Sequence, residues 1–151
     1  MTKTTGGKSD PRVVEAINHA FELDSKGQTE RAVQHLSALI AEFPTVGKIH
    51  AHLALFLYRS GRFDEAIEHG RKAVQLSPKS GIASAVLHRA LWETGKRIEA
   101  LDEMKRLLAI RPSKVYSDMI KDWHLGENVE AAIEAAKRVV IEDDRKKGWL
   151  T

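Results

Sequence analysis

The chain has 151 residues, of which 42% are hydrophobic and 30% charged, a balance typical of one folded domain rather than of a disordered chain. Its formal net charge is +3, but the 24 basic residues are dispersed among 21 acidic ones and only 6% are aromatic, which speaks against a nucleic-acid partner. The lack of cysteine excludes disulfides and thiolate sites, and no apolar run is long enough for a membrane span or a signal peptide, so we expect a cytoplasmic protein with no membrane partner.

The N-terminal residues 1–9 are polar and are predicted to form a disordered tail before a domain at 10–145. Ser9 or Asp10 is expected to cap a first helix that begins at Pro11. The tail contains Gly-Gly-Lys-Ser, but it lacks the upstream glycine and the preceding strand of a phosphate-binding loop. It is therefore not interpreted as a nucleotide site.

Three kinds of marker residue recur along the chain at an interval of 34 residues, as in the glycines at 27, 61 and 95. A shared period without insertions indicates internal repeats, which we place at 13–46, 47–80 and 81–114. The markers are Gly27, Gly61 and Gly95; Ala32, Ala66 and Ala100; and Pro44, Pro78 and Pro112.

Each repeat is predicted to contain two helices. In the second repeat, Phe63, Ile67 and Val74 recur at helical spacing after the glycine, and Ile49, Leu53 and Leu57 do so before it. Glycine suits the turn because it tolerates positive φ, and the alanine after it allows two helix backbones to approach closely. Proline ends the second helix because its ring clashes with a continuing turn.

These markers resemble the tetratricopeptide repeat family over about Val13 to Lys114. Ala20 and Ala54 match the small residue of the family's first helix, but leucine replaces the usual tyrosine before each glycine, and His88 occupies a position where a small residue is usual. The resemblance implies an all-α, right-handed solenoid of stacked helix pairs with a concave groove, and a protein without catalysis or cofactor. It also implies that His88 is buried, and a buried imidazole needs a hydrogen-bond partner.

The segment 115–145 departs from the period and is interpreted as a degenerate capping unit. It predicts a helix through Trp123, a break at Gly126, and a second helix. One face of that second helix is expected to carry Val129, Ile133, Ala136, Val139 and Val140.

The C-terminal tail 146–151 follows an expected helix end near Gly148. Its Trp149 and Leu150 are predicted to fold back onto the last helix pair. The alternative is that they dock into the groove of another copy, which would make a homo-oligomer.

The seven histidines show no spacing that predicts a metal site, and His50 and His52, two residues apart, lie on different sides of a helix. Paired carboxylates such as Asp64 and Glu65 occupy helix starts, where acidic residues are ordinary. The sequence therefore predicts neither an enzyme nor a metal protein. An enzyme or a regulatory subunit with His88 or His124 in its site stays open as the less favoured class.

The register of the resemblance places the first helix of each pair along the groove. From it we expect Val14, Ile17, Asp24, Ala51, Ile82 and Ala85 to face the groove, with Ile17, Ala51 and Ala85 equally suited to packing between helices. The side chains predicted to bind a partner are Phe21, Lys48, Leu55, Tyr58, Arg59, Arg89 and Trp92.

These residues predict an adaptor or scaffold that binds another protein or peptide. The expected partner carries apolar anchors and some acidic residues. The family resemblance extends to chaperone cofactors, in which a clamp of lysine, asparagine and arginine binds a terminal carboxylate. This sequence lacks those residues. Its corresponding positions hold Ile17, Phe21, His52, Ile82 and Val86. The alternative is a small secretion-type chaperone for an apolar partner, which the family resemblance also allows.

Overall fold

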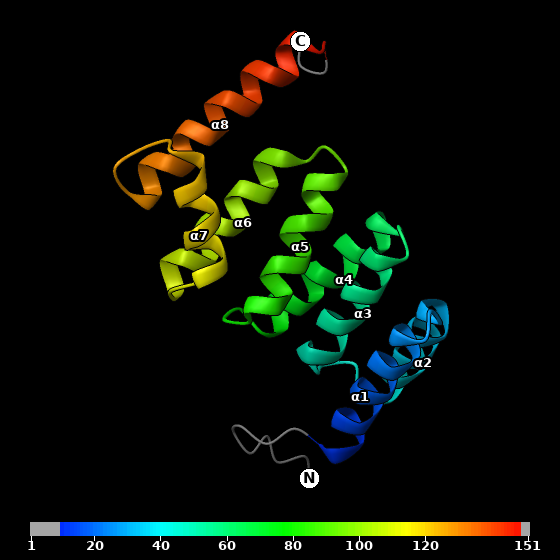
Figure 1. The fold of residues 1–151 in the computed structure, drawn as a ribbon. Coiled ribbons are helices and arrows are strands. Elements are labelled where there is room, and N and C mark those ends of the chain that lie inside the picture. Colours follow the sequence, from blue (N-terminus) through cyan, green and yellow to red (C-terminus); the bar gives the residue numbers. More distant parts are fainter. Residues whose placement is uncertain (1–9, 149–151) are drawn as a thin grey trace.

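The chain folds into antiparallel helix pairs, as the computed structural model shows for residues 10–148 (Figure 1). In that range all regular secondary structure is helical, and the pairs stack in chain order from the blue N-terminal end to the red C-terminal helix. The expected all-α, right-handed solenoid is confirmed. The helices are α1 (Pro11–Ser25), α2 (Thr29–Glu42), α3 (Gly47–Arg59), α4 (Phe63–Leu76), α5 (Gly81–Glu93), α6 (Arg97–Ile110), α7 (Lys114–Trp123) and α8 (Val129–Lys146).

A glycine in the left-handed region closes the turn inside each of the first three pairs. Gly27, Gly61 and Gly95 have φ values of 75°, 76° and 81°. A Cβ added at any of them would meet nothing within 4 Å, so glycine is needed for the backbone conformation and not for space. In the second pair the Arg62 amide donates to the Leu57 carbonyl at 2.9 Å, and the other two pairs have the same bond, which satisfies a free carbonyl at each helix end.

The repeated alanines belong to the core of the stack. Ala32, Ala66 and Ala100 are fully buried, as are Ala20 and Ala54 of the first helices. A larger side chain at these buried positions would have to displace its neighbours.

The hydrophobic core has two main parts that meet near α6. The first joins α1 to α5 and includes large buried side chains such as Leu36, Ile49 and Phe56. The second joins α6, α7 and α8 around Met104, Tyr116, Ile133 and neighbouring residues. The last three helices therefore form a packing unit of their own at the C-terminal end of the stack.

The C-terminal unit departs from the prediction on one face of α8. Ile133, Ala136 and Val140 are buried as expected, but Val129 and Val139 are 39% and 55% exposed. α8 ends the described stack and packs on α6 and α7, so its buried stripe is narrow. Val139 is rotated out of it by its position next to Val140, and Val129 is the first residue of the helix.

The ends of the domain are described up to residues 10 and 148. Asp10 caps α1 by accepting a hydrogen bond from the Arg12 amide at 2.9 Å, as predicted. The expectations for residues 1–9 and for Trp149 and Leu150 fall on residues outside the described range. Among helices α1 to α8, none combines the length and the apolar character that a membrane span requires.

Candidate functional site

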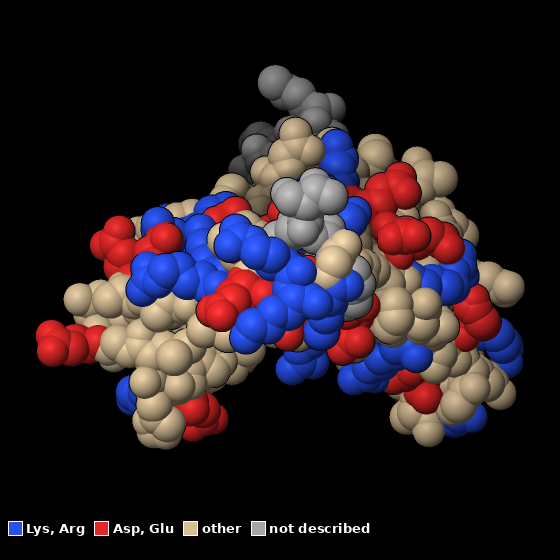
Figure 2. Space-filling view, turned by 90° about the horizontal axis from the view of Figure 1, so that it is seen from above, with Lys and Arg blue, Asp and Glu red and all other residues tan. Residues whose placement is uncertain are grey.

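The odd-numbered helices form the inner layer of the stack. α1 contacts α3 and α3 contacts α5, whereas no comparable contacts join α2 to α4 or α4 to α6. A stack whose inner helices are closer together than its outer ones must curve toward the inner layer. Figure 2 shows the resulting arch, with a hollow between its two ends.

Most of the side chains predicted to bind a partner are exposed. Phe21, Lys48, Arg59, Arg89 and Trp92 are exposed on α1, α3 and α5. Leu55 and Tyr58 are half-buried, and Tyr58 packs on the core with its ring 5.5 Å from that of Phe63. The first five are therefore more accessible to a partner than the last two.

Two other expected groove residues are buried and do not face the groove. Ile17 and Ala51 are buried, with 4% and 1% of their surface exposed, so they pack between helices. Arg59 forms an ion pair with Asp24 across α1 and α3. Within residues 10–148, by contrast, Lys48 and Arg89 form no ion pair, so two cations of the inner layer are available to a partner.

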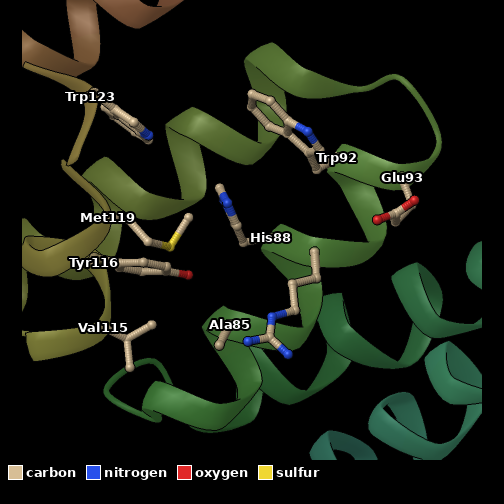
Figure 3. Close-up of a pocket in the computed structure, with 9 residues that line it drawn as sticks. Ala85, His88, Trp92, Glu93, Val115, Tyr116, Met119 and Trp123 are labelled. Atoms are coloured by element: carbon tan, nitrogen blue, oxygen red, sulfur yellow. The ribbon is translucent and has the colours of Figure 1, made fainter. Parts of the chain in front are cut away.

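A pocket of about 190 Å³ lies between α5 and α7 (Figure 3). Three of the expected groove residues, Ala85, Arg89 and Trp92, line it from α5. In the close-up, Tyr116 and Met119 of α7 point toward His88 of α5, and Glu93 lies apart from them. The complete lining is Ala85, His88, Arg89, Trp92, Glu93, Val115, Tyr116, Met119 and Trp123.

The pocket exists because the last inner helix stands away from its neighbour. α8 packs on α6, while α7 packs mainly on α8 and not along α5 as α5 packs along α3. The turn between α7 and α8 also differs from the turns inside the regular pairs, because it holds His124 at φ 55° and Gly126 at φ 147°. A hydrogen bond of 2.8 Å between Ser84 Oγ and the Tyr116 hydroxyl joins the two helices at the base of the gap.

His88 is buried on the pocket wall, as its repeat position predicted, with 4% of its surface exposed. Its Nδ1 donates a hydrogen bond to the Ala100 carbonyl at 2.8 Å. Burial, and to a lesser degree the charge of Arg89, holds the pKa of His88 below its usual range despite that hydrogen bond. His88 is therefore neutral near pH 7, with its remaining nitrogen Nε2 unprotonated.

Trp92 lines the pocket and contacts two other side chains, His88 and Arg97. Its ring lies 6.1 Å from that of His88 in a stacked arrangement, and the Arg97 guanidinium lies over the ring at 5.7 Å from its centre. Arg97 in turn pairs with Asp143 at 2.9 Å and with Asp144 of α8. The rim is thus connected to the C-terminal helix.

The sequence analysis did not predict the α7 side of the site. Counted from Val115, the other three residues follow after one, four and eight positions, which places all four on one face of a helix: Val115, Tyr116, Met119 and Trp123. That pattern was available from the sequence. The groove register was read only from the three regular repeats, and so it ended at Trp92.

Two histidines, His50 of α3 and His69 of α4, come together outside the pocket. His50 Nε2 donates to the Pro44 carbonyl at 3.0 Å, so His69 Nδ1–H donates to the bare His50 Nδ1 at 3.2 Å. Among the residues that the structure describes, no three histidine, aspartate or glutamate side chains gather as a metal ion would require. The hydrogen bond of the pair joins α3 to α4.

Buried and half-buried histidines predict an acid-sensitive fold. Burial lowers the pKa values of His52, His69 and His88, so the unfolded chain takes up protons below about pH 6.5 before the folded chain does. The contribution of these histidines to the free energy of unfolding is therefore fully present above that pH. It falls as pH decreases, by up to about 1.4 kcal/mol per pH unit for each extra proton that the unfolded chain binds. Urea unfolding at pH 7.5, 6.5 and 5.5 measures this, and a flat profile would contradict it. Replacing His69 with glutamine should reduce the slope.

Comparison with known families identifies the repeat. Two models of the tetratricopeptide repeat match the chain, one over residues 18–81 and the other over residues 57–120. Together they cover about two thirds of the chain. None of the curated proteins compared with it matches significantly.

Several solved structures share the fold at low sequence identity. The second repeat domain of Spaghetti (RPAP3), bound to an HSP90 peptide, is 20% identical with a TM-score of 0.62 and covers 67% of this chain and 94% of its own. The TPR2B domain of yeast Sti1, in complex with an Hsp70 peptide, is 17% identical with a TM-score of 0.62, covering 85% and 98%. The Yersinia enterocolitica secretion chaperone SycD, in complex with a peptide of the translocator YopD, is 18% identical with a TM-score of 0.66, covering 85% and 95%. At these identities the likeness shows the fold alone.

Proposed function

Because this chain belongs to the tetratricopeptide repeat family, we propose that its inner face binds a segment of another protein, so that it acts as an adaptor or scaffold. The role consists of binding, without catalysis and without a cofactor. The stacked helices hold the binding side chains in place before the partner arrives, which limits the conformational entropy lost on binding.

The observation that carries this proposal is the chemistry of the exposed inner face. It presents exposed apolar side chains, Val14, Phe21, Ile82 and Trp92, together with the unpaired cations Lys48 and Arg89. Aromatic and arginine side chains are frequent energetic anchors of interfaces, and cations attract acidic partners over longer distances. A segment with apolar anchors and some acidic residues is the complementary partner.

The same face argues against recognition of a terminal carboxylate by the clamp of the chaperone cofactors. Of the corresponding positions, Ile17, His52 and Val86 are buried, and Phe21 and Ile82 are exposed apolar residues. None of them offers a cation. We therefore propose recognition of an internal, partly apolar segment.

The second candidate is a small secretion-type chaperone that keeps an apolar partner soluble. The apolar pocket between α5 and α7 favours it, because such a pocket can cover a side chain that would otherwise promote aggregation. Both candidates use the same face. They differ in whether the partner is soluble when it is expressed alone, which centrifugation of a lysate measures once the partner is identified.

A charge reversal on the inner face should weaken partner binding. Replacing Lys48 and Arg89 with glutamate changes the two cations without entering the core, and we expect at least a tenfold loss of affinity for peptides selected from a random display library. Fluorescence polarisation with the selected peptides measures the loss, and circular dichroism verifies that the helix content is unchanged.

The matched control carries the same charge change on the outer layer. Lys72 on α4 and Arg138 on α8 are exposed, and replacing both with glutamate should leave the affinity within about twofold of wild type. Equal losses in the two variants would show that net charge, and not the inner face, governs binding. The proposal would then be abandoned.

A further inference from the structure

We infer that the pocket between α5 and α7 receives one aromatic side chain that carries a hydrogen-bond donor, tryptophan or tyrosine, next to an acidic residue of the partner. This inference rests on the proposed function and specifies the partner for one part of the inner face. Three properties of the pocket support it: its size, the acceptor on its wall and the cation at its edge.

The size of the pocket matches one aromatic ring. An engineered apolar cavity of roughly 150 Å³ binds benzene, and this pocket measures about 190 Å³. Trp92, Trp123, Tyr116 and Met119 line it, and aromatic rings and thioether sulfur make favourable contacts with a ring placed between them. Val115 at its edge is 55% exposed and would be covered by the ligand's backbone.

The wall of the pocket presents a fixed acceptor. Since His88 donates from Nδ1 to the Ala100 carbonyl, its neutral ring offers a lone pair at Nε2. Within the described residues Nε2 has no hydrogen-bond partner, yet it is not among the fully buried atoms that lack one, so it remains open to the pocket that His88 lines. A purely apolar ligand would cover this nitrogen without satisfying it, whereas an indole N–H or a phenol O–H would pair with it.

A cation lies at the edge of the pocket. Arg89 lines it, is exposed, and forms no ion pair with the described residues. Glu93, which also borders it, lies apart from His88 and Tyr116 in Figure 3. An acidic residue adjacent to the aromatic one would therefore meet Arg89, and a basic residue there would be repelled.

The test uses short synthetic peptides and the intact chain. The probe is acetyl-Ser-Gly-Trp-Glu-Gly-Ser-amide, titrated while ¹H–¹⁵N spectra follow the indole N–H signals of Trp92 and Trp123. We expect both signals to shift and the ¹⁵N resonance of His88 Nε2 to move as it accepts a hydrogen bond. Replacing the tryptophan with benzothienylalanine, which keeps the ring size but lacks the N–H, should weaken binding about tenfold and leave Nε2 unmoved.

Variants of the chain separate the pocket from the rest of the face. Ala85→Leu places a larger side chain into the pocket and should abolish the shifts, and Arg89→Gln should remove the preference for glutamate over glutamine in the probe. Ala38→Leu, on exposed α2 surface, makes the same change away from the pocket and should leave binding unchanged.

Three results would overturn the inference. One is equal affinity for the tryptophan and benzothienylalanine peptides, and another is unchanged binding by Ala85→Leu. The third is binding only after residues 149–151 are removed, which would assign the pocket to the chain's own Trp149. Failure of the proposed function is distinguishable, because library-selected peptides that bind wild type and Ala85→Leu equally would leave the inner face in place and remove only the pocket.

Discussion

Replacing Gly70 with leucine is expected to lower the free energy of unfolding by about 3 kcal/mol or more. Gly70 lies inside α4 and is buried against α5, where an added Cβ would come within 3.2 Å of Leu87 Cβ and 3.4 Å of its Cα. Leucine would add three more carbon atoms where the backbone of α5 already lies, and a gain of about 1 kcal/mol in helix propensity would offset only part of the strain. Urea unfolding followed by circular dichroism at pH 7.5 measures the change.

The control is the same substitution at Gly81, near the start of α5. A Cβ there would meet nothing within 4 Å, so Gly81→Leu should change stability by no more than about 0.5 kcal/mol. Gly70→Ala should lie between the two, because the propensity gain opposes a smaller displacement of Leu87. A stable Gly70→Leu variant would contradict close contact between α4 and α5.

The regular repeats were predictable because each depends on local chemistry. Gly27 and its counterparts all adopt positive φ, and a buried alanine follows five residues later in every pair. Such features repeat with the period, so a single sequence contains three independent examples of each. That redundancy accounts for the agreement in helix order and in the burial of His88.

The α5–α7 pocket could not be predicted in the same way. Its width depends on where α7 packs relative to α5, and α7 belongs to the segment that departs from the 34-residue period, so the chain offers only one example of this arrangement. The face of α7 that includes Tyr116 and Trp123 was visible as a helical pattern, but the pattern does not show whether such a face closes onto α5 or leaves a gap. The exposure of Val139 has the same origin, since it depends on which side of α8 has a neighbour.

Glycine inside a helix was the other missed signal. Gly70 interrupts an otherwise regular helical pattern, which indicates either a weak helix or a close backbone approach. The structure shows the second: α5 crosses α4 at Leu87. Sequence periodicity describes which face of a helix is buried, but it does not give the distance at which the next helix lies.

Replacing Arg97 with methionine is expected to release α8 and to lower stability by about 3 kcal/mol, because it leaves Asp144 buried without its partner. The side chains of Arg97 and Asp144 are only 16% and 10% exposed, and their ion pair connects the start of α6 to the end of α8. Arg97 also lies over the ring of Trp92. Native-state hydrogen exchange should show the largest loss of protection in α8 and little change in α1 to α4, since the two ends of the stack have separate cores.

Arg71→Met is the matched control: its pair with Glu99, at 2.7 Å, is 52% exposed on both sides and should contribute less than about 1 kcal/mol. The double variant Arg97→Met with Asp144→Leu should recover most of the loss, because no unpaired charge then remains buried. If Arg97→Met and Arg71→Met were equally mild, the pair would not hold α8, and the rim of the pocket at Trp92 would need another support.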